Sequence, residues 1–263
     1  MVRAPIRLYW WNESPNFGDS LSPLLIDRLF SRRSVWSALE EAELTACGSL
    51  LQWITPIQAN RAAELAVWGS GFIFPNEPPP ALTKVHYYAV RGAQSAAFAG
   101  LTHTSVPLGD PGLLASRVVP KSPAKYAVGL VPHLWHRDNN EFRRLAVEFE
   151  GSLLIDVTRD PQKVLEEISS CELIVSSSLH GLVVADSYGI PNAWVSASPD
   201  SFGGRYKFDD YYSAFSASQR APMTLDATTK PLDIKEAARL CCDASELQSL
   251  QDELISSFPE HLR

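Results

Sequence analysis

The sequence has little cysteine, little methionine and no long apolar run, and its acidic residues outnumber its basic ones. With 4 cysteines and no C-x-x-C pair, it favours reduced thiols over a disulfide framework, and no metal site is expected. The 23 lysines and arginines against 30 aspartates and glutamates give a formal net charge of −7, which argues against a nucleic-acid-binding protein. It has no stretch of about 18 apolar residues and no apolar leader, so we expect a cytoplasmic protein without a transmembrane segment.

Hydrophobic residues make up 45% of the 263 residues and charged residues 20%, as in a globular protein large enough for a substantial core. Short apolar runs alternate with helical patterns, which predicts parallel strands connected by helices, an α/β fold. The predicted strands are residues 6–11, 65–68, 85–90, 127–131, 152–156, 173–176 and 192–195. The predicted helices are residues 20–30, 93–99, 140–150, 161–170 and 179–188.

A polar, proline-bearing stretch at residues 119–125 is typical of a linker between domains. We therefore predict two Rossmann-like domains, residues 1–120 and 121–231, facing each other across a cleft. Residues 233–257 carry apolar side chains at intervals of three to four, so residues 232–263 are predicted to hold one helix that packs back on both domains. Ligands of such folds bind beyond the carboxyl ends of the strands, which directs attention to polar residues directly after predicted strands.

The segment 173–192 carries the strongest functional pattern. An apolar strand leads into three serines, then His180 and Gly181, and then a helix of small residues. The serines are expected to cap this helix, and its N-terminal N–H groups would favour a phosphate or carboxylate. His180 would stand in the first turn, beside a bound anion, where it can move a proton. A serine cap beside a purely structural histidine is the plainer alternative.

Two segments of the first half suggest contacts with a sugar. Trp11, Asn16, Gly18 and Asp19 follow the first predicted strand, where an aromatic ring and polar groups can stack on and hydrogen-bond a carbohydrate. A turn followed by an aspartate cap would give the same pattern. Gly71 belongs to a Gly-Ser-Gly that lacks the third glycine of a dinucleotide fingerprint, so it indicates close backbone approach in the cleft.

Four charged positions and one histidine are further candidates. Arg91 follows a strand and can fork onto a phosphate, although a solvated arginine is equally compatible with the pattern. Asp110 lies between glycine and proline, where it either acts in the cleft or caps the next helix. His133 directly follows a strand. Arg205 and Lys207 lie in residues 203–212, a predicted basic and aromatic loop that either closes over an anion or is simply solvated.

Seven short motifs occur in order and together resemble the polysaccharide pyruvyltransferase family. They are N-F-G-D-x-L (16–21), G-S-G-F (69–72), V-R-G-x-x-S (90–95), L-G-D-P-x-L (108–113), G-L-V-P-H (129–133), S-S-L-H-G (177–181) and K-F-x-D-Y-Y (207–212). Each motif is weak alone, and their order over residues 9–212 carries the resemblance. The sequence is most similar to the exopolysaccharide ketal-pyruvyltransferase branch.

The resemblance implies a GT-B-like arrangement in which the C-terminal domain holds phosphoenolpyruvate and the N-terminal domain faces the acceptor. It implies transfer of the pyruvyl group onto two hydroxyls of a sugar in an exopolysaccharide or cell-surface glycan precursor, with release of phosphate and no further cofactor. The catalytic residue is then His180. From their chemistry, Asp19 and Asp110 are further catalytic candidates, which either orient the acceptor hydroxyls or act as the partner base. The donor-binding residues are Arg91, Ser95, His133, Ser177, Ser178, Gly181, Arg205 and Lys207. The acceptor-binding residues are Trp11, Asn16, Gly18 and Gly71.

One departure concerns the donor clamp. Some family members have an arginine where this chain has Ser178, so another cation, Arg91, Arg205 or Lys207, must hold the phosphate. A lipid-linked acceptor would bring the enzyme into peripheral contact with the inner face of the cytoplasmic membrane. Two alternatives stay open: a GT-B glycosyltransferase that uses a nucleotide sugar, and a glycan-binding module without catalysis.

Overall fold

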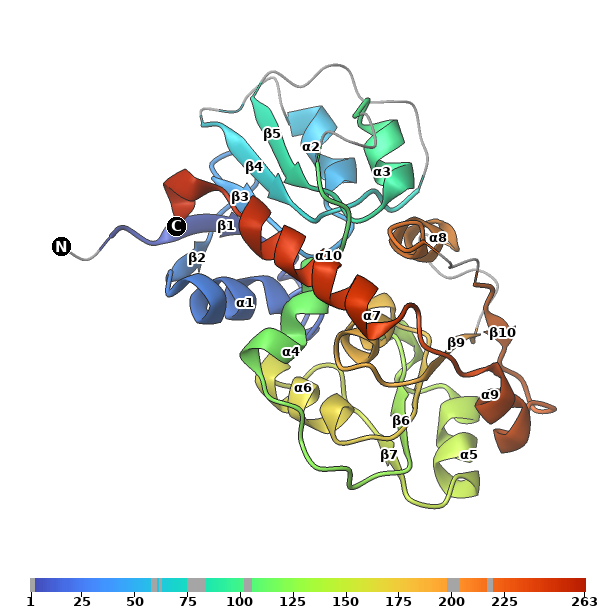
Figure 1. Cartoon of the computed structure of the whole chain (residues 1–263). Helices are drawn as coiled ribbons and strands as arrows, with labels where there is room; N and C mark the ends of the chain where they lie inside the picture. The colour runs from blue at the N-terminus through green and yellow to red at the C-terminus, as the bar shows by residue number, and fades with distance from the viewer. Residues whose placement is uncertain are drawn as a thin grey trace.

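The computed structural model describes residues 3–57, 61, 63–74, 84–101, 106–197, 204–216 and 220–263, which form two parallel five-stranded sheets (Figure 1). The first sheet contains β1 (Ile6–Tyr9), β2 (Ser34–Trp36), β3 (Leu44–Thr45), β4 (Leu65–Trp68) and β5 (Val85–Ala89). The second contains β6 (Val128–Val131), β7 (Ser152–Leu154), β8 (Ile174–Ser176), β9 (Asn192–Ser196) and β10 (Met223–Thr224). This arrangement is consistent with the predicted pair of Rossmann-like units.

The two sheets share one strand order. The first runs β2-β1-β3-β4-β5 and the second, read from its other edge, β7-β6-β8-β9-β10. When the strands are numbered within their own sheet, each sheet has the order 2-1-3-4-5. In this doubly wound arrangement, successive strands are added toward one edge and then toward the other, and the reversal lies between strands 1 and 3. Ligands bind such sheets beyond the carboxyl ends of those two strands. The residues that follow β1, β3, β6 and β8 are therefore the ones to inspect.

The helices lie in layers around the sheets. The outer face of the first sheet packs against α2 (Leu51–Ile57) and α3 (Ala93–Phe98), and that of the second against α5 (Asn140–Glu148) and α9 (Pro231–Ala237). Between the sheets lie α1 (Leu21–Phe30), η2 (Pro111–Leu114), α4 (Ala115–Val118), α6 (Pro161–Ser169) and α7 (Leu179–Ser187). The remaining helical segments are η3 (Leu134–His136), α8 (Tyr206–Tyr212), α10 (Ala244–Ser257) and η4 (Glu260–Leu262). None of the described helices is long and apolar enough to cross a bilayer.

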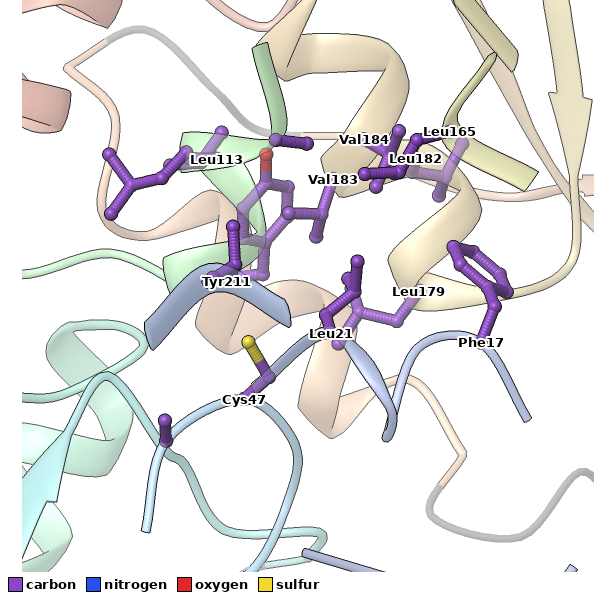
Figure 2. Close-up of a cluster of buried hydrophobic side chains, with 14 of the residues drawn as sticks. Phe17, Leu21, Cys47, Leu113, Leu165, Leu179, Leu182, Val183, Val184 and Tyr211 are labelled. Atoms are coloured by element: carbon purple, nitrogen blue, oxygen red, sulfur yellow. The ribbon is translucent and has the colours of Figure 1, made fainter. Parts of the chain in front are cut away.

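One hydrophobic core joins the two sheets. Ile6 and Leu8 of the first sheet belong to the same buried cluster as Val131 and Ile174 of the second. Figure 2 shows the part of this core where α1, η2, α7 and α8 meet, with Leu21 beside Leu179. We call the part built on β1–β5 the first half and the part built on β6–β10 the second half. Each fully buried aliphatic side chain contributes about 1.5–3 kcal/mol to the free energy of unfolding, so the two halves are held together by packing as well as by the chain between them.

The helix that begins after the three serines is buried along its whole length. All nine residues of α7 are buried, because it lies in the layer between the two sheets. Its small residues allow this packing: a Cβ on Gly181 would overlap Ser176 Oγ and lie 2.8 Å from a methyl of Val131. A helix that is apolar on every side is typical of such a central position.

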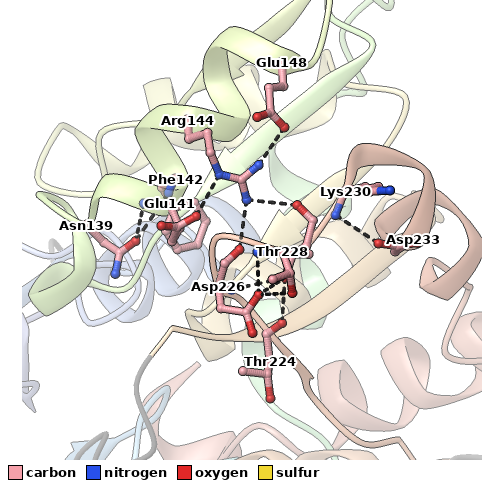
Figure 3. Close-up of polar contacts among 11 residues, drawn as sticks. Asn139, Glu141, Phe142, Arg144, Glu148, Thr224, Asp226, Thr228, Lys230 and Asp233 are labelled. Carbon is pink, nitrogen blue, oxygen red and sulfur yellow. Dashed lines mark hydrogen bonds and ion pairs between the residues drawn. The ribbon is translucent and has the colours of Figure 1, made fainter.

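The turn after β10 is fastened to α5 by one arginine (Figure 3). Arg144 donates through Nε to Glu141 at 2.8 Å and through Nη1 to Glu148 at 2.7 Å. Its Nη2 donates to the carbonyl oxygens of Asp226 at 3.0 Å and Thr229 at 2.9 Å. The guanidinium thereby fixes the connection between the edge strand β10 and α9.

The seven predicted strands and the first five predicted helices are confirmed, and the short strands β2, β3 and β10 were not foreseen. The predicted loop that contains Lys207 is wrong, because residues Tyr206–Tyr212 form the helix α8. The single helix predicted over residues 233–257 is wrong, because the structure has α9 and α10 there. Arg239 breaks the helix by exchanging two backbone hydrogen bonds of 3.1 Å with Asn192 of β9. Asp243 then caps α10 by accepting from the N–H groups of Ser245 and Glu246, both at 2.9 Å. The domain boundaries at 120 and 231 stay predictions.

The helix α10 crosses from one half to the other (Figure 1). On the first half, the indole of Trp68 in β4 donates to the carbonyl oxygen of Leu254 at 2.9 Å. Phe258, just beyond the helix, stacks on Phe30 with ring centroids 3.9 Å apart. Gln251 donates to the carbonyl oxygen of Leu113 in η2 at 2.7 Å, in the layer between the sheets.

Candidate active site

A cavity of about 390 Å³ lies between the two sheets, at the carboxyl ends of the strands between which each strand order reverses. Most of its wall comes from the segments that follow β1, β3, β6 and β8, with further residues from α2, α8 and the end of β4. The lining residues are Trp11, Ser14, Asn16, Asp19, Gly48, Ser49, Leu50, Trp53, Ile73, His133, Leu134, Trp135, Ser178, Leu179, His180 and Lys207. Seven of the residues predicted from the sequence are in this wall: Trp11, Asn16, Asp19, His133, Ser178, His180 and Lys207.

His180 and Asp110 form a buried pair at this cavity. His180 is the second residue of α7, and its Nε2 lies 3.6 Å from Asp110 Oδ2, the distance of an ion pair rather than a hydrogen bond. Asp110 is fully buried and caps η2, with Oδ1 accepting from the N–H of Gly112 at 2.8 Å. Burial alone would raise the pKa of Asp110, but the neighbouring His180 and the Gly112 N–H lower it below its usual value. Asp110 is therefore a carboxylate able to stabilise a protonated imidazole.

Gly18 fits closely against the other ring nitrogen of His180. A Cβ on Gly18 would overlap His180 Nδ1 and lie 2.7 Å from the ring carbon Cγ. The turn that carries Gly18 is anchored in the other half, because the N–H of Phe17 donates to the carbonyl oxygen of Val157 at 2.8 Å. The Asn-Phe-Gly-Asp turn thus lies directly on the histidine, and a side chain at Gly18 would displace the ring.

Asp19 is a second carboxyl group in the cavity wall. Its Oδ2 accepts a hydrogen bond of 2.7 Å from Asn16 Nδ2. Burial raises the pKa of Asp19, although His180, Asn16 and Lys207 act in the opposite direction. A carboxyl group with a raised pKa in a cavity is suited to proton transfer.

The serines before α7 do not all act as the sequence predicts. Ser178 is the N-cap residue but makes no side-chain capping hydrogen bond. Its own N–H donates to Ser176 Oγ at 2.9 Å. Ser177 Oγ accepts from the N–H of His133 at 3.0 Å and contacts His136 Nδ1 at 3.1 Å. The N–H groups of the first turn of α7 are therefore not covered by the cap side chain. Such groups favour a bound anion.

Lys207 and His133 bring hydrogen-bond donors to the same cavity. Burial, reinforced by Arg91, lowers the pKa of Lys207 to about 8, and the ammonium forms no ion pair with any carboxylate that the structure describes. Burial, with Lys207 and His136 acting the same way, lowers the pKa of His133 to about 3, so the ring is neutral. Its Nδ1 accepts from the N–H of Trp135 at 3.3 Å, which leaves the proton on Nε2.

Two predicted donor ligands lie behind the cavity wall. Arg91 is fully buried, donating to Asp210 Oδ2 at 2.8 Å, to Ser49 Oγ at 2.7 Å and to the carbonyl oxygen of Phe72. Ser95 Oγ donates to the same Asp210 oxygen at 2.6 Å. The structure therefore gives neither side chain a direct place at the cavity, and donor contact by Arg91 or Ser95 has no geometric support.

Other predicted residues support the wall or lie apart from it. Gly71 makes room for Arg91, since a Cβ there would come 2.5 Å from the guanidinium carbon. Gly181 lies within α7 and packs against Ser176 and Val131, as described above. Arg205 pairs with Asp209 at 3.0 Å and lies 5.8 Å from the ring centre of Trp194, beside a separate cavity of about 70 Å³ that Ser177 also lines.

Sequence reasoning missed part of the wall. Gly48, Ser49 and Leu50 were not predicted because β3, the strand before them, is only two residues long. Trp53 and Trp135 were not among the predicted site residues, yet both line the cavity, and Trp135 is 62% exposed. The position of Trp135 two residues after His133, beyond a predicted strand, was the available signal.

A family model and two known proteins match most of this chain. The family model described as polysaccharide pyruvyl transferase matches residues 9–199. An uncharacterized protein of Acanthamoeba polyphaga mimivirus is 26% identical over 225 residues, covering 81% of this chain and 75% of its own length. The succinoglycan biosynthesis protein ExoV of Rhizobium meliloti is 26% identical over 236 residues, covering 88% and 71%.

A crystal structure of an uncharacterized protein from Klebsiella pneumoniae is 11% identical, with a TM-score of 0.46, and the match covers 84% of this chain and 93% of that one. This likeness is too distant to add to the argument. The family model covers most of the chain, including the turn at Asp19, the Asp110 loop and the start of α7 with His180. The chain belongs to the polysaccharide pyruvyl transferase family.

Proposed function

We propose that the protein is a ketal pyruvyltransferase that moves the pyruvyl group of phosphoenolpyruvate onto two hydroxyls of a sugar in an exopolysaccharide precursor and releases phosphate. The observation that carries this proposal is the meeting of His180, backed by Asp110, with Asp19 and Lys207 in one cavity between the halves. Two facing α/β units with the site between them also support a GT-B-like arrangement.

The donor carries a phosphate and a carboxylate, and the second half supplies groups suited to both. The N–H groups at the start of α7, the Lys207 ammonium and the Nε2–H of His133 are donors at one end of the cavity. Together they replace the arginine that Ser178 does not provide. Fixed donors of this kind also stabilise the phosphate as it leaves.

The reaction needs two proton transfers. A proton added to C3 of phosphoenolpyruvate makes C2 electrophilic, and one sugar hydroxyl bonds to C2 as it loses its proton. The bond between C2 and the phosphate oxygen then breaks, and a second hydroxyl closes the ketal. The two sugar hydroxyls lose one proton each. One of these protons restores to the catalytic residue the proton that it gave to C3, and the other protonates the released phosphate. His180 Nδ1 serves these transfers, with Asp110 stabilising the imidazolium, and Asp19 orients the attacking hydroxyl.

The first half supplies the acceptor side of the cavity. Asn16 and Asp19 offer hydrogen bonds to hydroxyls, and the rings of Trp11 and Trp53 offer apolar faces to a pyranose. Trp135, which comes from the second half, adds a third ring to the cavity wall. The resemblance to a protein named for succinoglycan biosynthesis supports an exopolysaccharide precursor as the acceptor.

Ligand-induced stabilisation tests the donor. We expect millimolar phosphoenolpyruvate to raise the melting temperature of the wild-type protein, and UDP- and GDP-sugars to leave it unchanged. Stabilisation by a nucleotide sugar alone would reject the proposal in favour of a glycosyltransferase.

A turnover assay tests the chemistry. Purified protein, phosphoenolpyruvate and a panel of exopolysaccharide precursors should release phosphate in step with a mass gain on the acceptor. His180→Ala should lose this activity while it still binds phosphoenolpyruvate, because the donors that hold the anion remain. Near-normal turnover by His180→Ala would exclude the proposed role of the histidine.

A further inference from the structure

A fully buried ion pair fastens α8, which follows the second sheet's β9 in the chain, to the first half of the molecule. Asp210 Oδ2 accepts from Arg91 Nε at 2.8 Å, and both side chains are 0% exposed. Asp210 Oδ1 accepts from the N–H of Ser95 at 2.7 Å, so the carboxylate also covers the start of α3. Figure 1 shows α8 lying beside α3. On its other side α8 meets the second sheet, where Phe208 stacks on Trp194 of β9 with ring centroids 4.4 Å apart.

Two glycines make this contact possible. A Cβ on Gly92 would overlap the backbone carbonyl oxygen of Asp210, so only glycine lets α8 come this close to the start of α3. A Cβ on Gly71 would lie 2.5 Å from the Arg91 guanidinium carbon. The N–H of Ala93 donates to Ser213 Oγ at 2.9 Å, which fixes the far end of α8 as well.

Lys207 and Asp210 are three residues apart on α8, a spacing that places side chains on neighbouring positions of one helix face. The contacts of Asp210 with the first half therefore contribute to the position of the Lys207 ammonium, together with the contacts that Phe208 and Tyr211 make with the second half. We propose that Arg91, Asp210 and Gly92 are positioning residues that hold α8 against the first half, so that Lys207 reaches the donor end of the cavity. This inference rests on the proposed function, in which Lys207 binds the donor anion.

The surroundings of Lys207 fit this role. The Lys207 ammonium interacts electrostatically with Arg91 of the first half and with Asp19 in the turn before α1. It also interacts electrostatically with His133 and His136 in the segment after β6. The Lys207 ammonium also lies 5.5 Å from the ring centre of Phe208 on its own helix. Burial is the largest cause that lowers the pKa of Lys207 to about 8, and Arg91 is the second. The pKa of Lys207 therefore reports whether α8 is packed against the first half.

The first measurement needs no substrate. An amine-labelling reagent applied over a range of pH, with mass spectrometry of the peptide that contains Lys207, gives the midpoint of its titration. We expect a wild-type midpoint near 8 and a rise toward 10.5 in Asp210→Asn and in Gly92→Ala, because the ammonium regains water when α8 moves. Because Gly92→Ala changes no charge, a higher midpoint in both variants would show that a changed position of α8, and not the loss of a charge, is the cause. A midpoint at or below the wild-type value in a folded Gly92→Ala protein would overturn the inference.

The second measurement is phosphoenolpyruvate affinity by calorimetry. We expect both variants to bind about tenfold or more weakly, the loss typical of one charge-assisted contact. The control is Arg117→Gln, which breaks a partly exposed ion pair of 2.8 Å with Asp252 between α4 and α10, outside the cavity wall. Its midpoint and affinity should match the wild type. Unchanged affinity in a folded Gly92→Ala protein would contradict the inference.

The two measurements separate the two proposals. If wild-type protein binds no phosphoenolpyruvate, the proposed function fails, and the labelling midpoints alone still decide whether the Arg91–Asp210 contact positions Lys207. If Asp210→Asn does not fold, because it leaves Arg91 buried without its partner, Gly92→Ala decides both measurements.

Discussion

Asp110 Oδ2 and His180 Nε2 lie 3.6 Å apart, and neither atom has a hydrogen-bond partner within the described part of the chain. Such unpaired buried polar atoms are costly, and here they face each other beside a cavity. A small approach of the two groups would form a charge-assisted hydrogen bond when the imidazole takes up a proton. Asp110 Oδ2 is therefore placed to accept a hydrogen bond from the imidazole during catalysis.

The variant Asp110→Asn tests this arrangement. We expect turnover to fall by about 10²–10⁴-fold, because the carboxylate charge that stabilises the imidazolium is lost. The asparagine keeps an oxygen that can accept from the Gly112 N–H, so η2 and the melting temperature should be largely preserved. Phosphate release under saturating donor is the measurement, and turnover within twofold of wild type would show that the Asp110 charge is not used.

The variant Gly18→Ala tests the contact on the opposite side of the ring. The new methyl group overlaps His180 Nδ1, so the imidazole must move, and we expect turnover to drop about 10²-fold, as misplacement by 1 Å can cause. Donor affinity should change far less, since the donor's anion is held elsewhere. Ser14→Ala, on the same cavity wall, is the matched control and should keep its turnover. Equal losses in both variants would argue against a specific contact with His180.

The depressed pKa of His133 predicts a loss of stability in acid. Its folded pKa is about 3, against 6.5 in the unfolded chain, so between these values only the unfolded state binds the proton. The unfolding free energy should therefore fall as pH decreases from 6.5 toward 3, by at most about 1.4 kcal/mol per pH unit from this group. Urea unfolding of wild type and His133→Gln across this range measures the difference, and identical slopes would refute the prediction.

The shared core predicts that the two sheets unfold together. Leu21 on α1 packs against residues of the second half, so Leu21→Ala should destabilise both halves, by about 2–5 kcal/mol. Hydrogen exchange in β4 and β8 should accelerate to the same extent, and denaturation should remain a single transition. Faster exchange confined to β4 would mean that the halves unfold separately.

Much of the fold was predictable because the longer strands are continuous apolar runs, whereas β3 pairs through only two residues and leaves no pattern. The position of His180 after a buried strand was also readable. Asp110 was named as a catalytic candidate beside it, but the direct contact of the two side chains could not be predicted, because it depends on how α7 packs against η2.

Arg91 shows most clearly what the local sequence pattern does not predict. An arginine after a strand gives the same local pattern whether it meets a ligand or a buried acid, and here its partner Asp210 lies 119 residues further along the chain. The break between α9 and α10 likewise depends on a distant partner, Asn192, and the apolar spacing continues across it. Local pattern predicted the elements, and long-range contacts decided the roles.

The contact between Trp68 and Leu254 spans 186 residues. During translation, the first sheet leaves the ribosome long before α10 exists, so the apolar surface around Trp68 stays exposed while the rest of the chain is made. Phe30, which later stacks on Phe258, is left uncovered in the same period. We therefore expect newly made chains to require protection from aggregation until α10 docks and closes the first half.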